Sequence, residues 1–350
     1  PSNLTVSNVT ENSMNLSWNI PSTHYANRWL IQRRSNGGAW SNFATVTSDT
    51  TNYFVSGLTA SSSYEFRIYG ESGGPAWSGT RSLSSSNSVS VKTLPAKPTN
   101  LTVTNKTGNS VSFTWSTASP HGADRWRVEY VVGTQPWQEV TTVTSKSFTM
   151  NGLSASTVYA FRVIAECDNA DGTTTDSVVS STLRIITLPA QPTNLTASNI
   201  TDDSVSLSWS TASPHGADRW LIQYRTSGGT WTDYDTSTSK SCTVTGLTAN
   251  TAYEFRVYGE RYGTQTWPSE YSLVSNTASA TTVMPVVQPV QPTELIITAL
   301  TGNSVSLAWS TDTPHYADRW LIQYRPENGT WVNYDYTTDL YITVSGLTEG

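Results

Sequence analysis

The chain has 350 residues, of which only 13% are charged, and its net charge is -6. Ser and Thr together account for 104 of the 350 residues, so we expect a surface rich in hydroxyl groups and only mildly acidic. The 20 Lys and Arg residues are scattered singly, which excludes a basic surface for nucleic acid or anionic lipid. No apolar run approaches the roughly 18 residues that a membrane helix needs.

Tryptophan spacing divides the chain into four repeats. The pattern Trp-x10-Trp-x10-Trp begins at Trp18, Trp115, Trp209 and Trp309, in steps of 97, 94 and 100 residues. A unit of that length can bury a core of its own, unlike the shorter repeats of a solenoid. The predicted domains are residues 1–96, 97–190, 191–290 with an extended linker, and 291–350, which we call repeats 1 to 4.

Each repeat is a succession of short segments in which apolar and polar residues alternate. In repeat 3 this alternation covers Val205 to Trp209, Trp220 to Tyr224 and Tyr253 to Val257. Alternation with period two in runs rich in β-branched and aromatic residues is typical of half-buried antiparallel strands. Seven such runs, separated by Gly, Asn, Ser and Pro turns, predict an all-β, immunoglobulin-like sandwich without helices.

The sequence resembles the fibronectin type III family over nearly its whole length. The residues that carry the resemblance in repeat 3 are Pro-Thr-Asn-Leu-Thr in the first strand, Trp209 at the end of the second, Trp220 to Arg225 as the third, and Gly246 to Val257. The resemblance implies a seven-stranded sandwich, with a tyrosine corner formed in repeats 1 to 3 by Tyr64, Tyr159 and Tyr253. It does not specify a function, because modules of this family serve as spacers, adhesins and receptor domains.

Short, proline-containing junctions connect the first three repeats. Residues 93–98 and 187–192 leave only a few positions between the last strand of one repeat and the first strand of the next. Because proline restricts bending, we expect repeats 1 to 3 to form a stiff rod. The third junction, residues 283–292, is about six residues longer by comparison with the other two, so any hinge is expected there.

All four histidines occupy one repeat position, in the loop between the second and third strands. Each is followed three residues later by Asp, or by Asn27 in repeat 1, which is too few ligands for a zinc site. Because this loop should face the preceding repeat, we expect its His and Arg side chains to pack at the junction. The residues are His121, Arg125, His215, Arg219, His315 and Arg319.

No catalytic, cofactor or metal site is predicted, and the chain is not expected to be an enzyme. Residues 70–74 match the Gly-x-Ser-x-Gly pattern but lack the strand-to-helix turn that a nucleophile needs. The acidic loop from Glu166 to Asp176 could bind calcium or be a solvated loop, and it occurs only in repeat 2. Cys167 and Cys242 do not form a disulfide framework, which favours a microbial secreted protein over a disulfide-rich animal ectodomain.

The tryptophans fall into three groups. The first two of every triplet share a face with aliphatic residues and are predicted to be core. The third lies on a polar face, where it could stack beside arginines such as Arg225 or contact a glycan or another subunit; this group is Trp40, Trp137, Trp231 and Trp331. Trp77 and Trp267 lie in loops before the last strand and are the isolated candidates for stacking on a sugar.

Three Asn-x-Thr sequons have a suggestive position in the first strand. Asn3, Asn100 and Asn194 each precede a leucine that is expected to point inward. Because neighbouring strand residues face opposite ways, these asparagines should point outward and be available for glycosylation.

Repeat 4 contains five predicted strands and nothing that matches the sixth and seventh. We therefore expect Trp309, Trp320 and Ile322 to be uncovered and one strand edge to be unpaired. Either the sequence is a window from a longer array, or strands from another molecule complete the sandwich.

These features predict an extracellular or cell-surface structural or adhesive repeat rod, part of a larger surface or filament-forming protein. The alternative is an accessory spacer or carbohydrate-binding region of a secreted carbohydrate-active enzyme. The expected partners are other copies of the chain, neighbouring domains of a longer chain, or surface glycans, with no nucleic acid and no membrane insertion.

Overall fold

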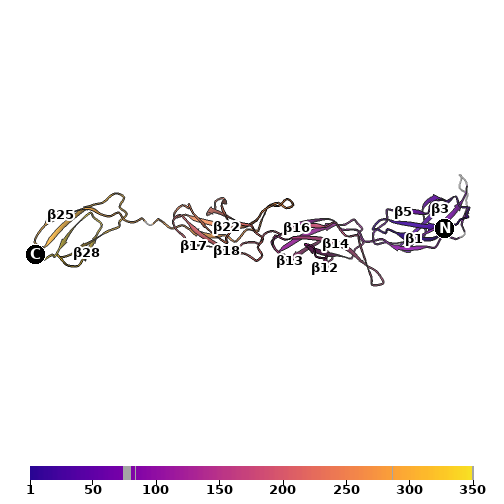
Figure 1. The fold of residues 1–350 in the computed structure, drawn as a ribbon, viewed down its shortest axis with the longest axis horizontal. Coiled ribbons are helices and arrows are strands. Elements are labelled where there is room, and N and C mark those ends of the chain that lie inside the picture. Colours follow the sequence, from indigo (N-terminus) through magenta and orange to yellow (C-terminus); the bar gives the residue numbers. More distant parts are fainter. Residues whose placement is uncertain (74–79, 83, 286, 349–350) are drawn as a thin grey trace. The chain divides into compact units, whose positions relative to one another are not determined.

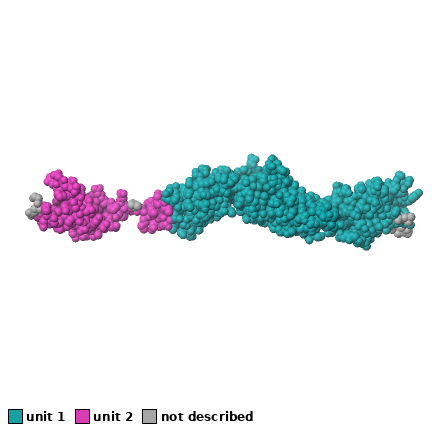
Figure 2. Space-filling view, turned by 90° about the horizontal axis from the view of Figure 1, so that it is seen from below, with its two compact units in different colours: residues 1–199, 205–245, 252–280 teal, residues 200–204, 246–251, 281–350 magenta. Residues whose placement is uncertain are grey.

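The computed structural model describes residues 1–73, 80–82, 84–285 and 287–348. Every regular element among these residues is a β-strand, which confirms the all-β prediction. The chain divides into two compact units, residues 1–199, 205–245 and 252–280 in one and residues 200–204, 246–251 and 281–350 in the other (Figure 2). The first unit contains strands β1 to β23, and the second contains β25 to β29.

Repeat 1 is a sandwich of a three-stranded and a five-stranded antiparallel sheet (Figure 1). The smaller sheet has the order β1 (Ser2–Ser7), β2 (Met14–Asn19), β5 (Asn52–Val55). The larger has the order β4 (Ser41–Thr47), β3 (Arg28–Ser35), β6 (Ser63–Ser72), β7 (Thr80–Arg81), and β8 (Val89–Lys92) also pairs with β6. The inward residues of both sheets form one core, as period-two alternation requires.

Repeats 2 and 3 reproduce this topology. In repeat 2 the sheets are β13 (Ser147–Asn151), β10 (Ser110–Ser116), β9 (Thr99–Lys106) and β12 (Gln138–Val143), β11 (Arg125–Val132), β14 (Val158–Asp168), β15 (Thr174–Asp176), with β16 (Leu183–Ile186) on β14. In repeat 3 they are β17 (Thr193–Ser198), β18 (Val205–Ser210), β21 (Ser241–Val244) and β20 (Thr232–Ser237), β19 (Arg219–Thr226), β22 (Ala252–Arg261), β23 (Glu270–Tyr271), with β24 (Ala278–Thr281) on β22.

An eighth strand of two or three residues, β7, β15 or β23, is added to the seven that the sequence predicts. This short strand pairs with the end of the preceding long strand. After the short strand, serine hydroxyls take the place of backbone pairing with that long strand. Ser86 Oγ accepts a hydrogen bond from Ile68 N at 3.0 Å, Ser180 Oγ from Val163 N at 2.9 Å, and Ser275 Oγ from Val257 N at 3.0 Å. These buried serines satisfy amides that would otherwise lack a partner.

The core tryptophans and the tyrosine corner lie where the sequence places them. The first two tryptophans of every triplet are buried, and in repeats 2 to 4 the pair meets edge to face with ring centroids 6.2 Å apart. Tyr64 Oη accepts a hydrogen bond from Thr59 N, and Tyr159 Oη accepts one from Ser154 N, both at 2.9 Å. Tyr253 is buried at the matching position.

Repeat 4 has a three-stranded sheet like those of the other repeats and a second sheet of two strands. They are β25 (Thr293–Leu300), β26 (Ser304–Ser310), β29 (Tyr341–Ser345), and the pair β27 (Trp320–Tyr324), β28 (Val332–Thr337). Among the described residues β27 therefore pairs only with β28, as the missing strands predict.

The expectation that Trp309, Trp320 and Ile322 would be uncovered is wrong. All three are buried, because the two tryptophans cover each other and pack with Val344. The exposed apolar surface lies instead on β25, where Leu295 is 67% exposed, against 2% for Leu4 at the same position of repeat 1.

Candidate functional site: the junctions between repeats 1, 2 and 3

A buried threonine anchors the start of each short linker. Thr93 Oγ1 donates a hydrogen bond to Thr59 O at 2.6 Å and accepts one from Ser62 N at 3.0 Å. In repeat 2, Thr187 Oγ1 donates to Ser154 O at 2.7 Å and accepts from Thr157 N at 3.0 Å. The linker thus leaves each sandwich from a fixed point. These threonines were not among the predicted site residues, although both lie in a recurring Thr-Leu-Pro-Ala motif that is visible in the sequence.

The linker backbone then binds the next repeat. Ala96 N donates a hydrogen bond to His121 O at 2.8 Å, and Ala190 N donates to His215 O, also at 2.8 Å. Both alanines are buried. The linker is therefore held to the histidine loop by a hydrogen bond between backbone groups.

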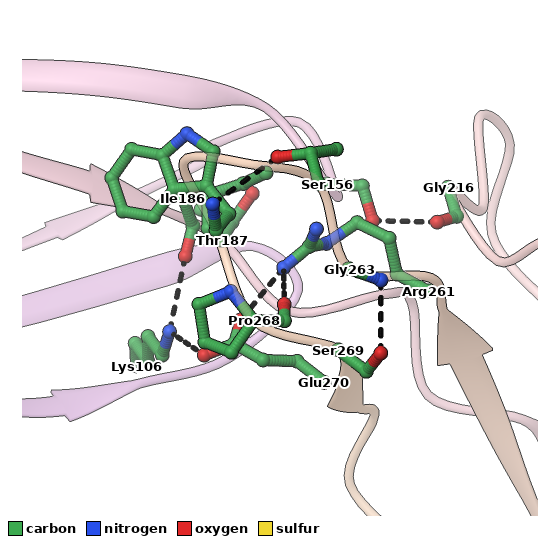
Figure 3. Close-up of polar contacts among 12 residues, drawn as sticks. Lys106, Ser156, Ile186, Thr187, Gly216, Arg261, Gly263, Pro268, Ser269 and Glu270 are labelled. Carbon is green, nitrogen blue, oxygen red and sulfur yellow. Dashed lines mark hydrogen bonds and ion pairs between the residues drawn. The ribbon is translucent and has the colours of Figure 1, made fainter.

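A serine of each preceding repeat reaches the residue that follows this histidine. Ser61 Oγ donates a hydrogen bond to Gly122 O at 2.7 Å, and Ser156 Oγ donates to Gly216 O at 2.6 Å (Figure 3). Each serine lies in the turn just after the Gly-Leu pair of its repeat. The two successive joints therefore share the same two polar contacts.

Side chains add contacts that differ between the joints. At the second joint, Lys106 Nζ forms an ion pair with Glu270 at 2.5 Å and donates to Ile186 O at 3.3 Å, and Arg261 contacts the same Glu270 at 3.3 Å (Figure 3). At the first joint, Lys92 Nζ donates to Asn169 Oδ1 at 2.7 Å and approaches Cys167 Sγ at 3.2 Å.

The histidine rings order their own loops. His121 Nδ1 accepts a hydrogen bond from Ala123 N at 3.0 Å, and His215 and His315 accept the equivalent bonds at 3.1 Å. The ring of His121 also packs 5.2 Å from Trp126, and His215 packs 5.2 Å from Trp220. The ring of each of these histidines orders its own loop, while the backbone carbonyl of the same residue accepts the hydrogen bond from the linker.

The ion pairs and ring contacts of the loop arginines lie within their own repeats, and the packing of these side chains at the junction stays a prediction. Arg125 pairs with Glu166 and Asp168 of its own repeat, and Arg219 pairs with Glu260. Arg319 stacks 4.0 Å from the ring centroid of Tyr336, again within its own repeat. Buried Glu166 and Glu260 on the neighbouring long strands attract Arg125 and Arg219, because a buried carboxylate needs a charged partner.

The same pairing accounts for the acidic loop considered as a calcium site. Glu166 contacts Arg125 and Arg127, and Asp176 contacts Arg127 at 2.6 Å. In the part of the chain that the structure describes, no group of three or more His, Cys, Asp or Glu residues could hold a metal ion. These carboxylates balance arginine charge instead.

The third tryptophan of each triplet stacks against arginine. Trp231 lies between Arg225 and Arg256, whose guanidinium carbons are 4.4 and 4.2 Å from its ring centroid. The equivalent distances are 4.9 and 4.1 Å for Trp40, 4.3 Å for Trp137 and 4.9 Å for Trp331. The predicted cation–π arrangement is confirmed in all four repeats. Trp331 is the most open of the four, with 59% of its surface exposed.

Of the two isolated sugar-stacking candidates, Trp77 lies outside the described residues. Trp267 is half-buried in the turn between β22 and β23, where its backbone N donates to Thr264 Oγ1 at 3.1 Å. A half-buried indole has less free face for a sugar ring than the sequence alone suggests.

Asn3, Asn100 and Asn194 are exposed, and their backbones are left-handed, with φ of 52°, 54° and 54°. Each lies where the first strand loses register with the second. Asparagine tolerates this conformation better than most residues, which is a structural reason for its recurrence there. Glycosylation at these positions stays a prediction.

Comparison with known proteins identifies the family. The model of the fibronectin type III domain matches residues 1–83, 96–181 and 190–274, so the chain belongs to the fibronectin type III family. No helix of the described residues is long and apolar enough to cross a membrane.

The curated relatives include a receptor-type phosphatase and an exoglucanase. Receptor-type tyrosine-protein phosphatase F of Danio rerio is 30% identical over 49% of this chain and 9% of its own length. Exoglucanase B of Cellulomonas fimi is 31% identical over 60% of this chain and 20% of its own length. The chain thus spans a fifth or less of both curated relatives. Among solved structures, a segment of two fibronectin type III domains from chicken tenascin covers 53% of this chain and 99% of that chain, with 22% identity and a TM-score of 0.38.

Proposed function

We propose that this chain is a non-catalytic, extracellular repeat region that spaces and connects other parts of a larger surface or filament-forming protein. Its fibronectin type III domains are the kind of module that commonly serves this purpose. A cell-surface setting is supported by similarity to a protein named as a receptor-type phosphatase. Glu166 and Asp176 of the acidic loop form ion pairs with Arg125 and Arg127.

The observation that carries this proposal is the repetition of one joint. The same two hydrogen bonds form at both joints. They are Ala96–His121 and Ser61–Gly122 at the first joint, and Ala190–His215 and Ser156–Gly216 at the second. Each hydrogen bond of this kind contributes about 1 kcal/mol, and two per joint, with buried linker residues, restrict how one domain moves against the next. A joint that is built twice in the same way suits a region whose task is to hold a spacing.

Pulsed electron resonance tests the stiffness of the first joint. Spin labels on p-acetylphenylalanine at positions 41 and 142 would report one distance across it and leave both native cysteines unlabelled. Ser41 and Thr142 are exposed on β4 and β12. We expect a single narrow distance distribution in the 350-residue chain. A broad distribution in the unmodified chain would contradict a spacer with stiff joints.

A second candidate function is that of an accessory region of a carbohydrate-active enzyme, and similarity to Exoglucanase B favours it. If the chain binds glycans, it should bind at least one polysaccharide of a broad insoluble panel. Trp77→Ala combined with Trp267→Ala should then abolish pull-down without lowering the melting temperature. If Trp40→Ala still binds, the binding depends on the loop tryptophans and not on the tryptophans that stack against arginine. Failure to bind any polysaccharide would remove the binding form of this candidate.

A further inference from the structure

Two left-handed residues meet at each of the first two joints. Gly122 and Ser61 have φ of +61° and 49°, and Gly216 and Ser156 have φ of +62° and 47°. A Cβ atom added to Gly122 would lie 2.4 Å from Ser61 Cβ and 2.6 Å from its Oγ. At Gly216 the corresponding distances to Ser156 are 2.4 and 2.5 Å. Real Cβ atoms do not approach so closely, so only glycine allows these joints to close as they do.

The same position carries tyrosine in the other two repeats. Tyr25 in repeat 1 is 96% exposed, and Tyr316 in repeat 4 is 56% exposed. Ahead of repeat 4, the position of Ser61 and Ser156 is occupied by Asn250, and the linker is the long one at residues 283–292. Gly122 and Gly216 therefore occur together with a serine turn and a short linker, whereas Tyr316 occurs with Asn250 and the long linker.

We propose that the residue after the loop histidine decides which kind of partner the entry end of a repeat accepts. With glycine, the end is a docking surface for a fibronectin domain that presents serine in the turn after its Gly-Leu pair and is joined by a short Leu-Pro-Ala linker. With tyrosine, the side chain occupies the space of that turn and prevents docking. This inference builds on the proposed spacer function, because it names the residue pair that makes a joint stiff.

The contacts explain why one side chain has so large an effect. The hydroxyl of Ser61 must lie 2.7 Å from Gly122 O, and Ala96 N must lie 2.8 Å from His121 O, in one placement of the two domains. Any side chain at position 122 displaces the serine turn and breaks the first contact. Because the linker is short, the second contact is strained by the same displacement. By the same reasoning, Tyr25 would prevent a domain joined through a short linker from docking on the entry end of repeat 1.

The test compares two glycines that have similar backbones but different surroundings. Gly122→Ala introduces the overlap with Ser61, whereas Gly133→Ala, at φ +57° in repeat 2 with nothing within 4 Å, introduces only the backbone strain. Both variants are made in the 350-residue chain with spin labels at positions 41 and 142. We expect a broadened or displaced distance distribution for Gly122→Ala and an unchanged one for Gly133→Ala, with similar melting temperatures.

Two further variants keep the inference testable if Gly122→Ala folds poorly. Adding Ser61→Gly to Gly122→Ala removes the overlapping atoms together with the serine hydroxyl, so it should return the mean distance toward the unmodified value while the distribution stays wider. Ser61→Asn places the residue type of position 250 opposite Gly122 and should broaden the distance distribution while repeat 2 stays unmodified. The inference is overturned if Gly122→Ala keeps the unmodified distribution, or if Gly133→Ala changes it equally. A broad distribution in the unmodified chain would instead contradict the spacer function.

Discussion

Thr187 is fully buried at the end of repeat 2, and its hydroxyl serves two backbone groups of the preceding turn, Ser154 O and Thr157 N. Thr93 and Thr282 make the equivalent contacts in repeats 1 and 3. At the scale of single residues, hydroxyl groups and not charges satisfy many buried polar groups of this chain. This use of Ser and Thr explains part of their abundance in the composition.

Replacing Thr187 by valine keeps the volume and removes both hydrogen bonds. Because Ser154 O and Thr157 N then lose a partner, Thr187→Val should lower the free energy of unfolding of repeat 2 by about 1–3 kcal/mol. Hydrogen exchange of the β14 amides would measure the loss. The exposed replacement Thr142→Val on β12 is the control and should have little effect. Equal exchange rates in both variants would contradict a structural role for the hydroxyl.

The tryptophan–arginine stacks make a second prediction at this scale. Trp231 contacts two guanidinium groups, whereas Trp331 has one at 4.9 Å. Trp231→Leu should therefore destabilise its repeat by about 0.5–2 kcal/mol through loss of cation–π attraction, and Trp331→Leu by less. Chemical denaturation followed by circular dichroism would compare them. A larger loss for Trp331→Leu would show that the stacks do not contribute as proposed.

At the scale of strands, an asparagine clamp ties the first strand to the loop before the last one. Asn87 accepts a hydrogen bond from Leu4 N at 2.9 Å and donates to Leu4 O at 3.0 Å, and Asn276 does the same for Leu195 at 2.9 and 2.9 Å. Repeat 4 has no residues that match this loop or the strands around it. Leu195 is buried beside this clamp, whereas Leu295 at the same position of β25 is exposed.

Adding the missing strands should close repeat 4. Residues 251–282 of repeat 3 contain β22 to β24, and placing a copy of them after Gly350 would offer β27 the partner that β19 has in repeat 3. We expect weaker binding of a dye that reports exposed apolar surface, and slower hydrogen exchange in β27. The same addition with Phe255→Asp in the copied segment is the control and should not close the domain. Unchanged exchange in β27 would contradict this pairing.

At the scale of the whole molecule, the chain contains two kinds of linker. Residues 93–98 and 187–192 are short and hydrogen-bonded to the following repeat, and residues 283–292 are longer. In repeat 4, Val290 N donates to His315 O at 2.9 Å, so the last part of the long linker keeps the contact with the histidine loop. The additional residues of the long linker therefore lie before Val290 in the sequence.

The ion pair between Lys106 and Glu270 should make the second joint sensitive to salt. Both side chains are partly exposed, so added salt screens their attraction and the joint should loosen modestly. Spin labels at positions 142 and 232 should show a wider distance distribution at high ionic strength. Glu270→Gln should be wider at low salt and respond less to added salt. The first joint, labelled at positions 41 and 142, is the internal control. An equal salt response in Glu270→Gln would contradict this role of the pair.

Much of the fold could be predicted from local patterns. The tryptophan spacing gives the repeat length, and period-two alternation identifies the strands and the buried faces of Trp18 and Trp29, because burial on one face of a strand leaves that pattern in the sequence. The tyrosine corner followed from the family resemblance, and its hydrogen bonds are present at Tyr64 and Tyr159. The arginine stack on Trp231 could be predicted because Trp231 directly precedes β20, which pairs with the strand that carries Arg225.

The sequence by itself thus determined the repeat, the sandwich and the residues that face inward, since these depend on periodicities within one segment. Only the tertiary structure decided that Arg125 pairs within its own repeat, that Thr187 supports the linker, and that Gly122 meets Ser61. The contact between Gly122 and Ser61 joins residues 61 positions apart. No periodicity encodes such a contact, because it arises where two separately folded domains meet. Its traces in the sequence are the changes from serine to asparagine and from glycine to tyrosine where the linker lengthens.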